Sequence, residues 1–235
     1  MKYENIISLG YFCSPASEIK RLNMRKASYP FDWLICEFEF IMALIENAAN
    51  FEEILKEQNL YQFKDNLNVY CTERKEIIFF HEFTYMDRLK KQLPKVIEKY
   101  NRRFIRFYED ILNPTLFIRY IKDYEELKYI EKNYMHILGI VKKFNVNSQL
   151  IFVANNGIIS KKLDIFNVEK DSGDCVAREF LEKNSELKEK ILNSYIQGVI
   201  SINTKVEVKQ KMSTLEKLWR KFIRIFRPYI HYNRV

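Results

Sequence analysis

The stretch Asn5-Ile-Ile-Ser-Leu-Gly-Tyr-Phe-Cys-Ser-Pro-Ala16 predicts a strand, a turn and the start of a helix in close succession. Ile6 to Leu9 is apolar and ends at a glycine, as expected of a short buried strand. Ser14 followed by Pro15 fits a helix N-terminus, with serine as the N-cap residue and proline at the first helical position. Cys13 therefore lies between the carboxyl end of a strand and the amino end of a helix. The helix dipole and free N–H groups favour a thiolate there, although a cysteine is also a common small residue of the core.

Short apolar segments alternate with amphipathic ones along most of the remaining chain. Further strands are expected at 77–83, 115–121, 149–154 and 163–168, and helices at 15–22, 37–57, 87–112, 124–144 and 176–195. This alternation is typical of a parallel sheet covered by helices on both faces. The predicted fold is an α/β domain over residues 1–200 with an open, mostly parallel sheet.

The composition describes a packed globular protein and gives no sign of a metal site or a cofactor. The chain has 235 residues, of which 47% are hydrophobic and 15% aromatic, and this excludes a disordered chain. The four cysteines form no CxxC pair and the three histidines are scattered, so neither a metal nor a cofactor is expected. The sequence has neither an apolar signal region at its start nor a run of about 18 apolar residues. A cytoplasmic location with free thiols is the expectation.

The basic charge is concentrated at the C-terminal end. Eight of the 39 Lys and Arg but only one of the 31 Asp and Glu follow residue 208, so residues 1–208 hold 31 basic and 30 acidic side chains. A nearly neutral body argues against a nucleic-acid partner. After a linker at 201–211, residues 212–235 are predicted to form an amphipathic helix with opposed apolar and basic faces.

This tail helix could pack on the body, but its excess of cations favours an anionic bilayer. The expected location is peripheral, on the inner face of the cell membrane. The residues expected to bind the membrane are Trp219, Arg220, Lys221, Phe222, Arg224 and Phe226.

Several polar side chains are expected at the carboxyl ends of the strands, where open parallel sheets bind their ligands. Cys13, His81 and Asn155 would supply a thiol, an imidazole and a carboxamide at one edge. These groups suit covalent acyl transfer, in which the thiolate attacks, the imidazole moves the proton and the amide orients the imidazole. A histidine in so apolar a segment could also be a core residue.

Four arginines and one aspartate form a second group of candidate residues. Arginine suits a bidentate grip on phosphate or carboxylate, and the supporting or substrate-binding candidates are Asp32, Arg102, Arg103, Arg106 and Arg119. The three arginines on the expected 87–112 helix could equally pair with acids of that helix. Arg119 is the better candidate for binding a ligand, because a charged side chain at the end of a buried strand is costly unless it has a function. Asp32 lies among aromatics and is expected to be buried and bonded to backbone or to an arginine.

The motifs that carry a family resemblance are Ser8-Leu-Gly-x-x-Cys13, Arg25-x-x-Ser28-x-Pro-Phe-Asp-Trp33, His81, Tyr100-x-Arg-Arg-Phe-x-Arg106 and Phe117-Ile-Arg119. Together they resemble a bacterial family of domains of unknown function described as "putative papain-like cysteine peptidase", over roughly residues 4 to 160. The resemblance implies a Cys13 nucleophile and a His81 base, with a carboxylate or amide as third member. It also implies a papain-like α+β fold, an alternative to the parallel α/β scaffold that the alternation favours.

Two functions from different classes follow. The first is a membrane-recruited, cysteine-dependent hydrolase or acyl-transferase acting on an amide, ester or thioester, with a peptide, glycan or small molecule as substrate. The second is a protein of a cell-surface polysaccharide pathway that binds a phosphorylated or nucleotide-linked sugar through its arginines, with Cys13 structural. A membrane-recruited scaffold without enzymatic activity is a third possibility. Reactivity of the Cys13 thiol separates the first two.

Overall fold

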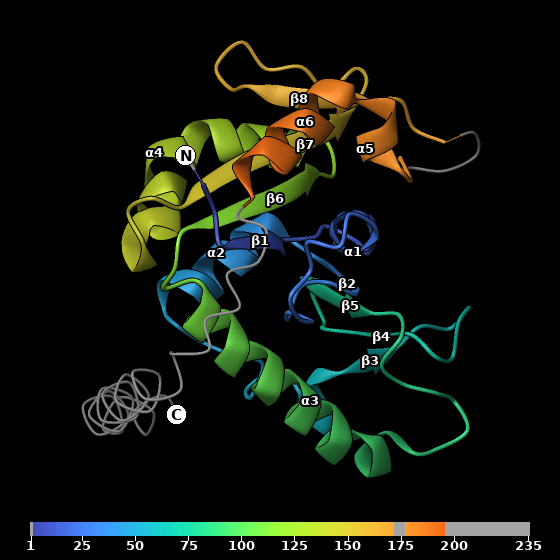
Figure 1. The fold of residues 1–235 in the computed structure, drawn as a ribbon. Coiled ribbons are helices and arrows are strands. Elements are labelled where there is room, and N and C mark those ends of the chain that lie inside the picture. The colour runs from blue at the N-terminus through green and yellow to red at the C-terminus, as the bar shows by residue number, and fades with distance from the viewer. Residues whose placement is uncertain (1, 172–176, 196–235) are drawn as a thin grey trace, which may run out of the picture. The chain divides into compact units, whose positions relative to one another are not determined.

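Four parallel strands form the central sheet of the computed structural model, which describes residues 2–171 and 177–195 (Figure 1). In spatial order they are β1 (Asn5–Ser8), β6 (Thr115–Ile121), β7 (Gln149–Asn155) and β8 (Ile165–Val168). Each strand is short and mostly buried, as the apolar runs predicted. The α/β class with an open parallel sheet is thereby confirmed. The linker at 201–211 and the tail helix at 212–235 lie outside the described residues.

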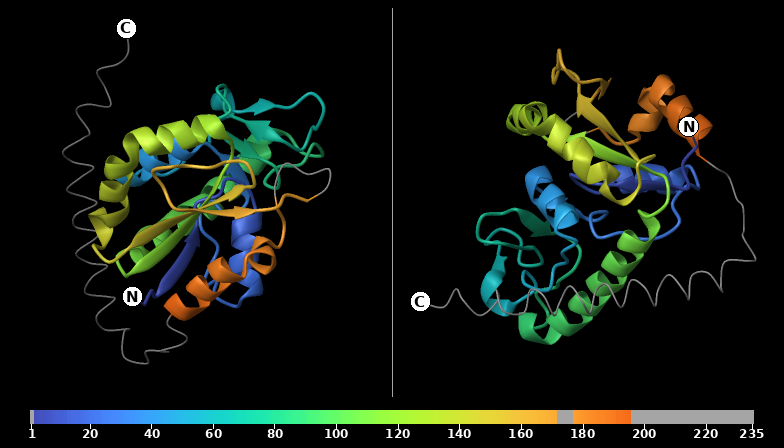
Figure 2. Two further views of the ribbon diagram at one scale, coloured as in Figure 1. Left: turned by 90° about the horizontal axis from the view of Figure 1, so that it is seen from above. Right: turned by 90° about the vertical axis from the view of Figure 1, so that its left-hand side faces the viewer.

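Helices cover both faces of this sheet, and successive residues of β6 show how the two faces are divided. Ile118 and Tyr120 belong to a core cluster with α1 (Ser14–Arg21), α5 (Phe180–Lys183) and α6 (Ser185–Ser194). Phe117 and Ile121 belong to the other cluster, with α2 (Phe38–Glu46), α3 (Leu89–Asp110) and α4 (Tyr124–Phe144). Figure 2 shows α4 and α6 on opposite sides of the strands. The alternation follows from the two-residue period of a strand.

A second, antiparallel sheet was not predicted. It contains β2 (Leu34–Cys36), β5 (Ile77–Phe79), β4 (Tyr70–Cys71) and β3 (Tyr61–Gln62), in that spatial order, with a 3-10 turn at Glu57–Asn59 before β3. The strand expected at 77–83 was assigned to the parallel sheet, and this is wrong. It stops at Phe79 and pairs antiparallel with β2 and β4, because an apolar run specifies burial and not the partner strand.

The helix boundaries differ from the predicted ones mainly where a polar residue interrupts a segment. The expected 37–57 helix stops at Glu46, and the expected 176–195 helix divides at Asn184. The Asn184 side chain accepts a hydrogen bond from Leu187 N at 2.9 Å and so caps α6. The segment 124–144 is helical as predicted, with Asp123 as its N-cap.

The order of the strands in the sheet changes direction at β1. The strands run in chain order from β1 to β8, and after β8 the chain returns to the free side of β1. There Tyr3 and Tyr195 form an isolated parallel bridge, and Tyr3 N donates to Ser194 O at 2.7 Å. The direction of winding therefore reverses at β1, the strand that leads into Cys13. In open α/β sheets such a reversal is where the crevice beyond the strand ends forms.

Candidate functional site

The turn that carries Cys13 is tied closely to β6. Tyr120 N donates to Gly10 O at 3.0 Å, which extends the β1–β6 pairing past the last residue of β1. Gly10 has a φ of +82°, and a Cβ at this position would lie 3.1 Å from Arg119 Nη1. Both facts require glycine here. The chain then turns, and Cys13, which is half-buried, becomes the N-cap of α1.

The predicted N-cap was Ser14, and the structure corrects this by one residue. Ser14 is the first helical residue, and its hydroxyl donates to Ala177 O at 3.2 Å instead of capping the helix. The thiol therefore occupies the position at which N–H groups of a first helical turn are left without helical partners.

Asn155 lies at the same edge of the sheet as Cys13. Tyr120, near the end of β6, bonds its hydroxyl to Asn155 Oδ1 at 2.5 Å, and its oxygen accepts from Ala177 N at 3.0 Å. The ring of Phe12 packs edge-on against the ring of Tyr120, with centroids 5.3 Å apart. Phe12 and Tyr120 therefore connect the Cys13 turn to Asn155. The sequence analysis overlooked Tyr120, whose place next to the last residue of a buried strand was the available signal.

His81 lies elsewhere, and its expected position at the rim of the parallel sheet is wrong. It follows β5, whose residue Ile77 pairs with Cys36, and Cys36 N in turn donates to Tyr11 O at 3.3 Å. The chain thus moves away from the Cys13 turn as it runs from Ile77 to His81. His81 is exposed, and within the described ranges no hydrogen bond joins it to Cys13.

Arg119 is a structural residue of the core and does not present a free charge to a ligand. Its side chain is fully buried and makes a bidentate pair with Glu126 at 2.7 and 2.8 Å. Its third nitrogen, Nη1, donates to Leu9 O at 2.8 Å and to Cys36 O at 3.1 Å. One guanidinium therefore joins β6, α4, the end of β1 and β2.

The remaining arginines also make internal contacts. Arg102 pairs with Glu98 on the exposed face of α3. Arg106 donates to Ser28 O at 3.2 Å. Arg103 is buried, and its Nη1 lies 3.5 Å from Glu82 Oε1. Glu82 also accepts from the Tyr100 hydroxyl and pairs with Lys99.

Asp32 is buried, as predicted, and it organises the loop before β2. Its Oδ2 accepts from Arg25 Nη2 at 2.6 Å and from Tyr29 N at 2.8 Å. Arg25 also stacks over Trp33 at 5.0 Å and donates to Ser28. The motif from Arg25 to Trp33 is therefore a packed loop, which is also tied to α3, since the Tyr29 hydroxyl donates to Asp110 Oδ2 at 2.7 Å.

In a comparison with protein families, the chain matches the model described as "Putative papain-like cysteine peptidase (DUF1796)" over residues 4–147. The chain belongs to this family. No curated protein and no solved structure matches it. The matched region contains Cys13 and His81 but ends before Asn155, so the third predicted member of the site lies outside the part that the family defines.

Within the family region, Cys13 differs from the other described cysteines in its exposure. Cys36 and Cys71 are buried. Burial raises the pKa of the Cys36 thiol above its usual range, and burial also raises the pKa of Cys71. Both are therefore poor nucleophiles at neutral pH, since the thiolate is the reactive form.

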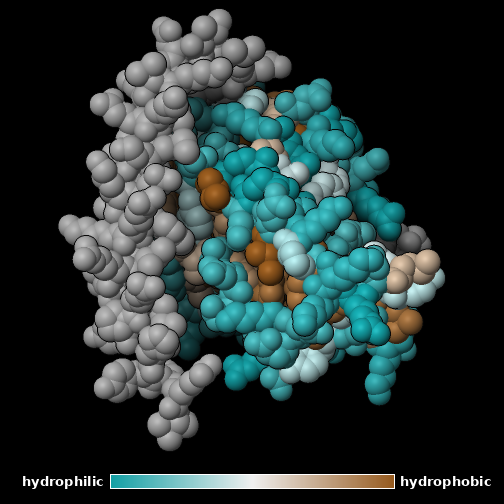
Figure 3. Space-filling model, turned by 90° about the horizontal axis from the view of Figure 1, so that it is seen from below, coloured by the Kyte–Doolittle hydropathy of each residue, from teal (hydrophilic) through white to brown (hydrophobic). Residues whose placement is uncertain are grey.

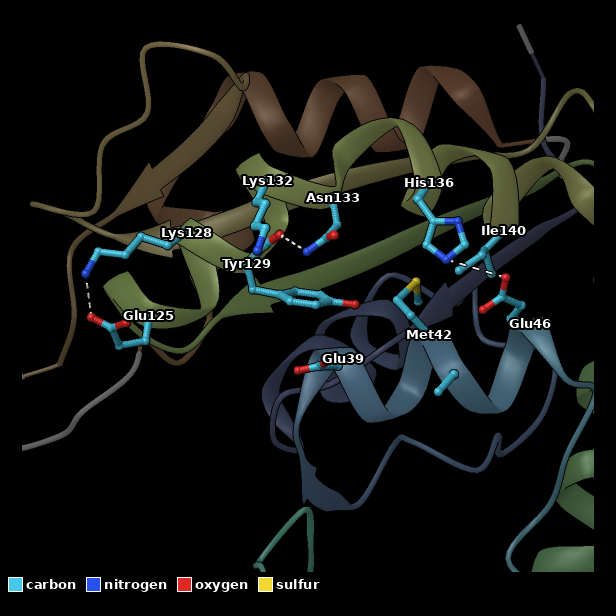
Figure 4. Close-up of a pocket in the computed structure, with 11 residues that line it drawn as sticks. Glu39, Met42, Glu46, Glu125, Lys128, Tyr129, Lys132, Asn133, His136 and Ile140 are labelled. Carbon is cyan, nitrogen blue, oxygen red and sulfur yellow. Dashed lines mark hydrogen bonds and ion pairs between the residues drawn. The ribbon is translucent and has the colours of Figure 1, made fainter.

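A groove of about 580 Å³ lies between α2 and α4, away from Cys13. Figure 4 shows His136 of α4 reaching Glu46 of α2, with 3.4 Å between Nε2 and Oε1, and Lys128 turned toward Glu125. Its walls carry both signs of charge, which the sequence analysis did not anticipate. The four-residue spacing of Lys128, Lys132 and His136 was the available signal.

Neither a metal site nor a membrane span was found among the described residues. Over 2–171 and 177–195, no three His, Cys, Asp or Glu side chains group closely enough to hold a metal ion. No helix in these ranges is long and apolar enough to cross a bilayer.

Proposed function

We propose that the protein is a cysteine-dependent hydrolase or acyl-transferase with Cys13 as its nucleophile. The observation that carries the proposal is the half-buried thiol at the N-cap of α1, beyond the carboxyl end of β1. In the first step the thiolate attacks a carbonyl carbon, the leaving group departs with a proton, and a thioester forms. Water or a second nucleophile then releases the acyl group. Backbone N–H groups of the first turn of α1 are suited to bind the oxyanion.

His81 is proposed as the base, and this requires the exposed segment after β5 to move toward Cys13. Asn155 is proposed as the residue that orients the imidazole, because its carboxamide is already fixed through Tyr120.

Alkylation of Cys13 by iodoacetamide, followed by peptide mass spectrometry over a range of pH, tests the nucleophile. We expect Cys13 to be alkylated at neutral pH, whereas the buried Cys36 and Cys71 should remain unlabelled. A thioester substrate panel then compares Cys13→Ser, His81→Asn and His136→Asn. Cys13→Ser should abolish turnover and His81→Asn should lower it, whereas His136→Asn is the control. A Cys13 that is labelled no faster than Cys36 and Cys71, or a Cys13→Ser variant with the turnover of the parent chain, contradicts the proposal.

The sugar-binding alternative receives less support. It needs arginines that can grip a phosphate, and Arg119 already has Glu126 and two carbonyls as partners. A lipid-linked glycan nevertheless remains within the proposed substrate classes, as an ester or phosphate-linked acceptor at the membrane.

Recruitment to the inner face of the cell membrane by residues 212–235 is also proposed, although this segment lies outside the described residues. Its support is the sequence alone, with Trp219 among apolar positions and cations between them. Co-sedimentation with anionic and neutral vesicles tests it. Reversing Lys217, Arg220 and Lys221 to Glu should reduce binding to anionic vesicles. The same reversal at the exposed Lys161, Lys162 and Lys170 serves as the control.

A further inference from the structure

Large apolar side chains are exposed together at the small antiparallel sheet. Of the eleven that are exposed in the described residues, five lie between Tyr61 and Met86. They are Tyr61 (49%), Leu67 (49%), Phe80 (40%), Tyr85 (60%) and Met86 (76%). Apolar atoms reach the surface at the right-hand edge of Figure 3, the side on which Figure 1 places the small sheet. Single exposed apolar residues need no explanation, but a group of them indicates a contact surface.

A hydrogen bond joins the two segments that carry these side chains, 61–69 and 80–91, and further hydrogen bonds fix each segment. Asn68 Oδ1 accepts from Tyr85 N at 2.9 Å. Gln92 at the start of α3 bonds both the N–H and the carbonyl of Thr84, each at 2.8 Å. Within the first segment, Gln62 Nε2 donates to Leu67 O at 2.6 Å. We call the exposed side chains of these two segments the loop surface.

The charges beside the loop surface are mainly positive once internal pairs are removed. Glu82 pairs with Lys99 and Arg103, and Asp87 pairs with Lys91. The exposed charges of the two segments that make no ion pair in the described part of the chain are Lys64, Asp65, Arg88 and Lys90. Lys95, exposed on the adjoining turn of α3, adds a further cation.

We propose that the loop surface is a second membrane contact, which binds the headgroup region of an anionic phospholipid bilayer. Tyrosines favour the interface, where the ring is apolar and the hydroxyl is wet. Leu67, Phe80 and Met86 gain by leaving water, and the three cations of the segments complement anionic headgroups. Loop backbone cannot enter hydrocarbon without losing its hydrogen bonds to water, so the contact stays at the interface. The proposal does not rest on the tail or on the reactivity of Cys13, although the segment 80–91 also carries His81.

Hydrogen exchange of the full chain, with and without vesicles of phosphatidylcholine containing about one third phosphatidylserine, tests the proposal locally. We expect slower exchange of amides in 61–69 and 80–91 when anionic vesicles are present. Unchanged exchange in both segments while the chain is bound overturns the proposal, because another part of the protein then makes the contact. Slowing that depends on protein concentration without vesicles also overturns it, since a second copy is then the partner.

A matched pair of variants tests the residues. Met86→Ser with Lys90→Glu removes one apolar and one basic group from the loop surface. Met135→Ser with Lys142→Glu makes the same change on α4, where Met135 is 78% exposed and Lys142 is exposed. We expect the first variant to bind anionic vesicles at least about fivefold more weakly, and the second to stay within about twofold of the parent chain. Equal weakening in the two variants, or equal binding of the parent chain to neutral vesicles, overturns the proposal.

Discussion

The guanidinium of Arg119 is bonded on three sides within the core, to Glu126 and to the carbonyls of Leu9 and Cys36. Replacing Glu126 with Gln leaves the positive charge buried without its counter-charge. We expect the free energy of unfolding to fall by roughly 3–5 kcal/mol, as measured by urea denaturation. The exposed pair between Arg102 and Glu98 on α3 is the control.

Replacing Glu98 with Gln should change the stability by less than about 1 kcal/mol, since solvent screens exposed pairs. Equal effects of the two substitutions would show that the stability does not depend on the buried pair between Arg119 and Glu126.

Replacing the single residue Asp32 is also expected to destabilise the fold. Its side chain is 2% exposed, and the side chain of its partner Arg25 is 13% exposed. Asp32→Ala removes the acceptor of Arg25 and of Tyr29 N, so we expect a loss of roughly 3–5 kcal/mol in the free energy of unfolding. Asp65→Ala, at an exposed position, is the control and should be nearly neutral. Parent-like stability of Asp32→Ala, measured by urea denaturation, would mean that the loop does not depend on this carboxylate.

At the scale of elements, α1 is held by a segment that follows the family region. Glu18 is buried and accepts from Leu181 N at 3.2 Å and from Arg21 Nε at 3.2 Å. Glu18→Gln keeps the shape but loses charge-assisted bonds, so we expect a loss of about 1–3 kcal/mol. Hydrogen exchange should also become faster at residues 177–187. Glu186→Gln, exposed on α6, is the control. Unchanged exchange in Glu18→Gln would show that Glu18 does not hold the segment around Leu181 against α1.

Elements could be predicted where their pattern is local. Thr115–Ile121 and 124–144 were predicted with the bounds that the structure gives, because an apolar run, Asp123 as a cap and a helical period all agree. The pairing of Arg119 with Glu126 could also have been predicted from the sequence. A strand that leads directly into a helix brings its end beside the first helical turn.

What the sequence could not specify was the choice of partner between distant segments. The run at 77–79 is apolar in either sheet, and only its pairing with β2 and β4 decides that β5 is antiparallel. His81 was misplaced for that reason. The bonds of Tyr120 to Asn155 and Ala177 span 35 and 57 residues, and no local pattern predicts them. Cys13 lies shortly after β1 and Asn155 is the last residue of β7, so both lie near the carboxyl ends of parallel strands.

At the scale of the whole molecule, the net charge of +8 is divided unevenly, with +7 after residue 208 and +1 before it. Binding to an anionic membrane should therefore depend on ionic strength. The Debye length falls from about 30 Å at 0.01 M salt to about 8 Å at 0.15 M, so electrostatic attraction weakens while burial of apolar side chains persists. We expect the affinity of the full chain for anionic vesicles to fall by about tenfold or more over this range.

The charge-reversed tail, with Lys217, Arg220 and Lys221 changed to Glu, separates the two contributions. Its binding should be weaker than that of the parent chain at low salt and should depend less steeply on salt, because only the few cations beside the loop surface then attract anionic lipid. Co-sedimentation across a salt series measures both chains. If the affinity of the parent chain for anionic vesicles does not change across the salt series, the tail has no electrostatic role. A variant as salt-dependent as the parent would place the attraction in the body and not in the tail.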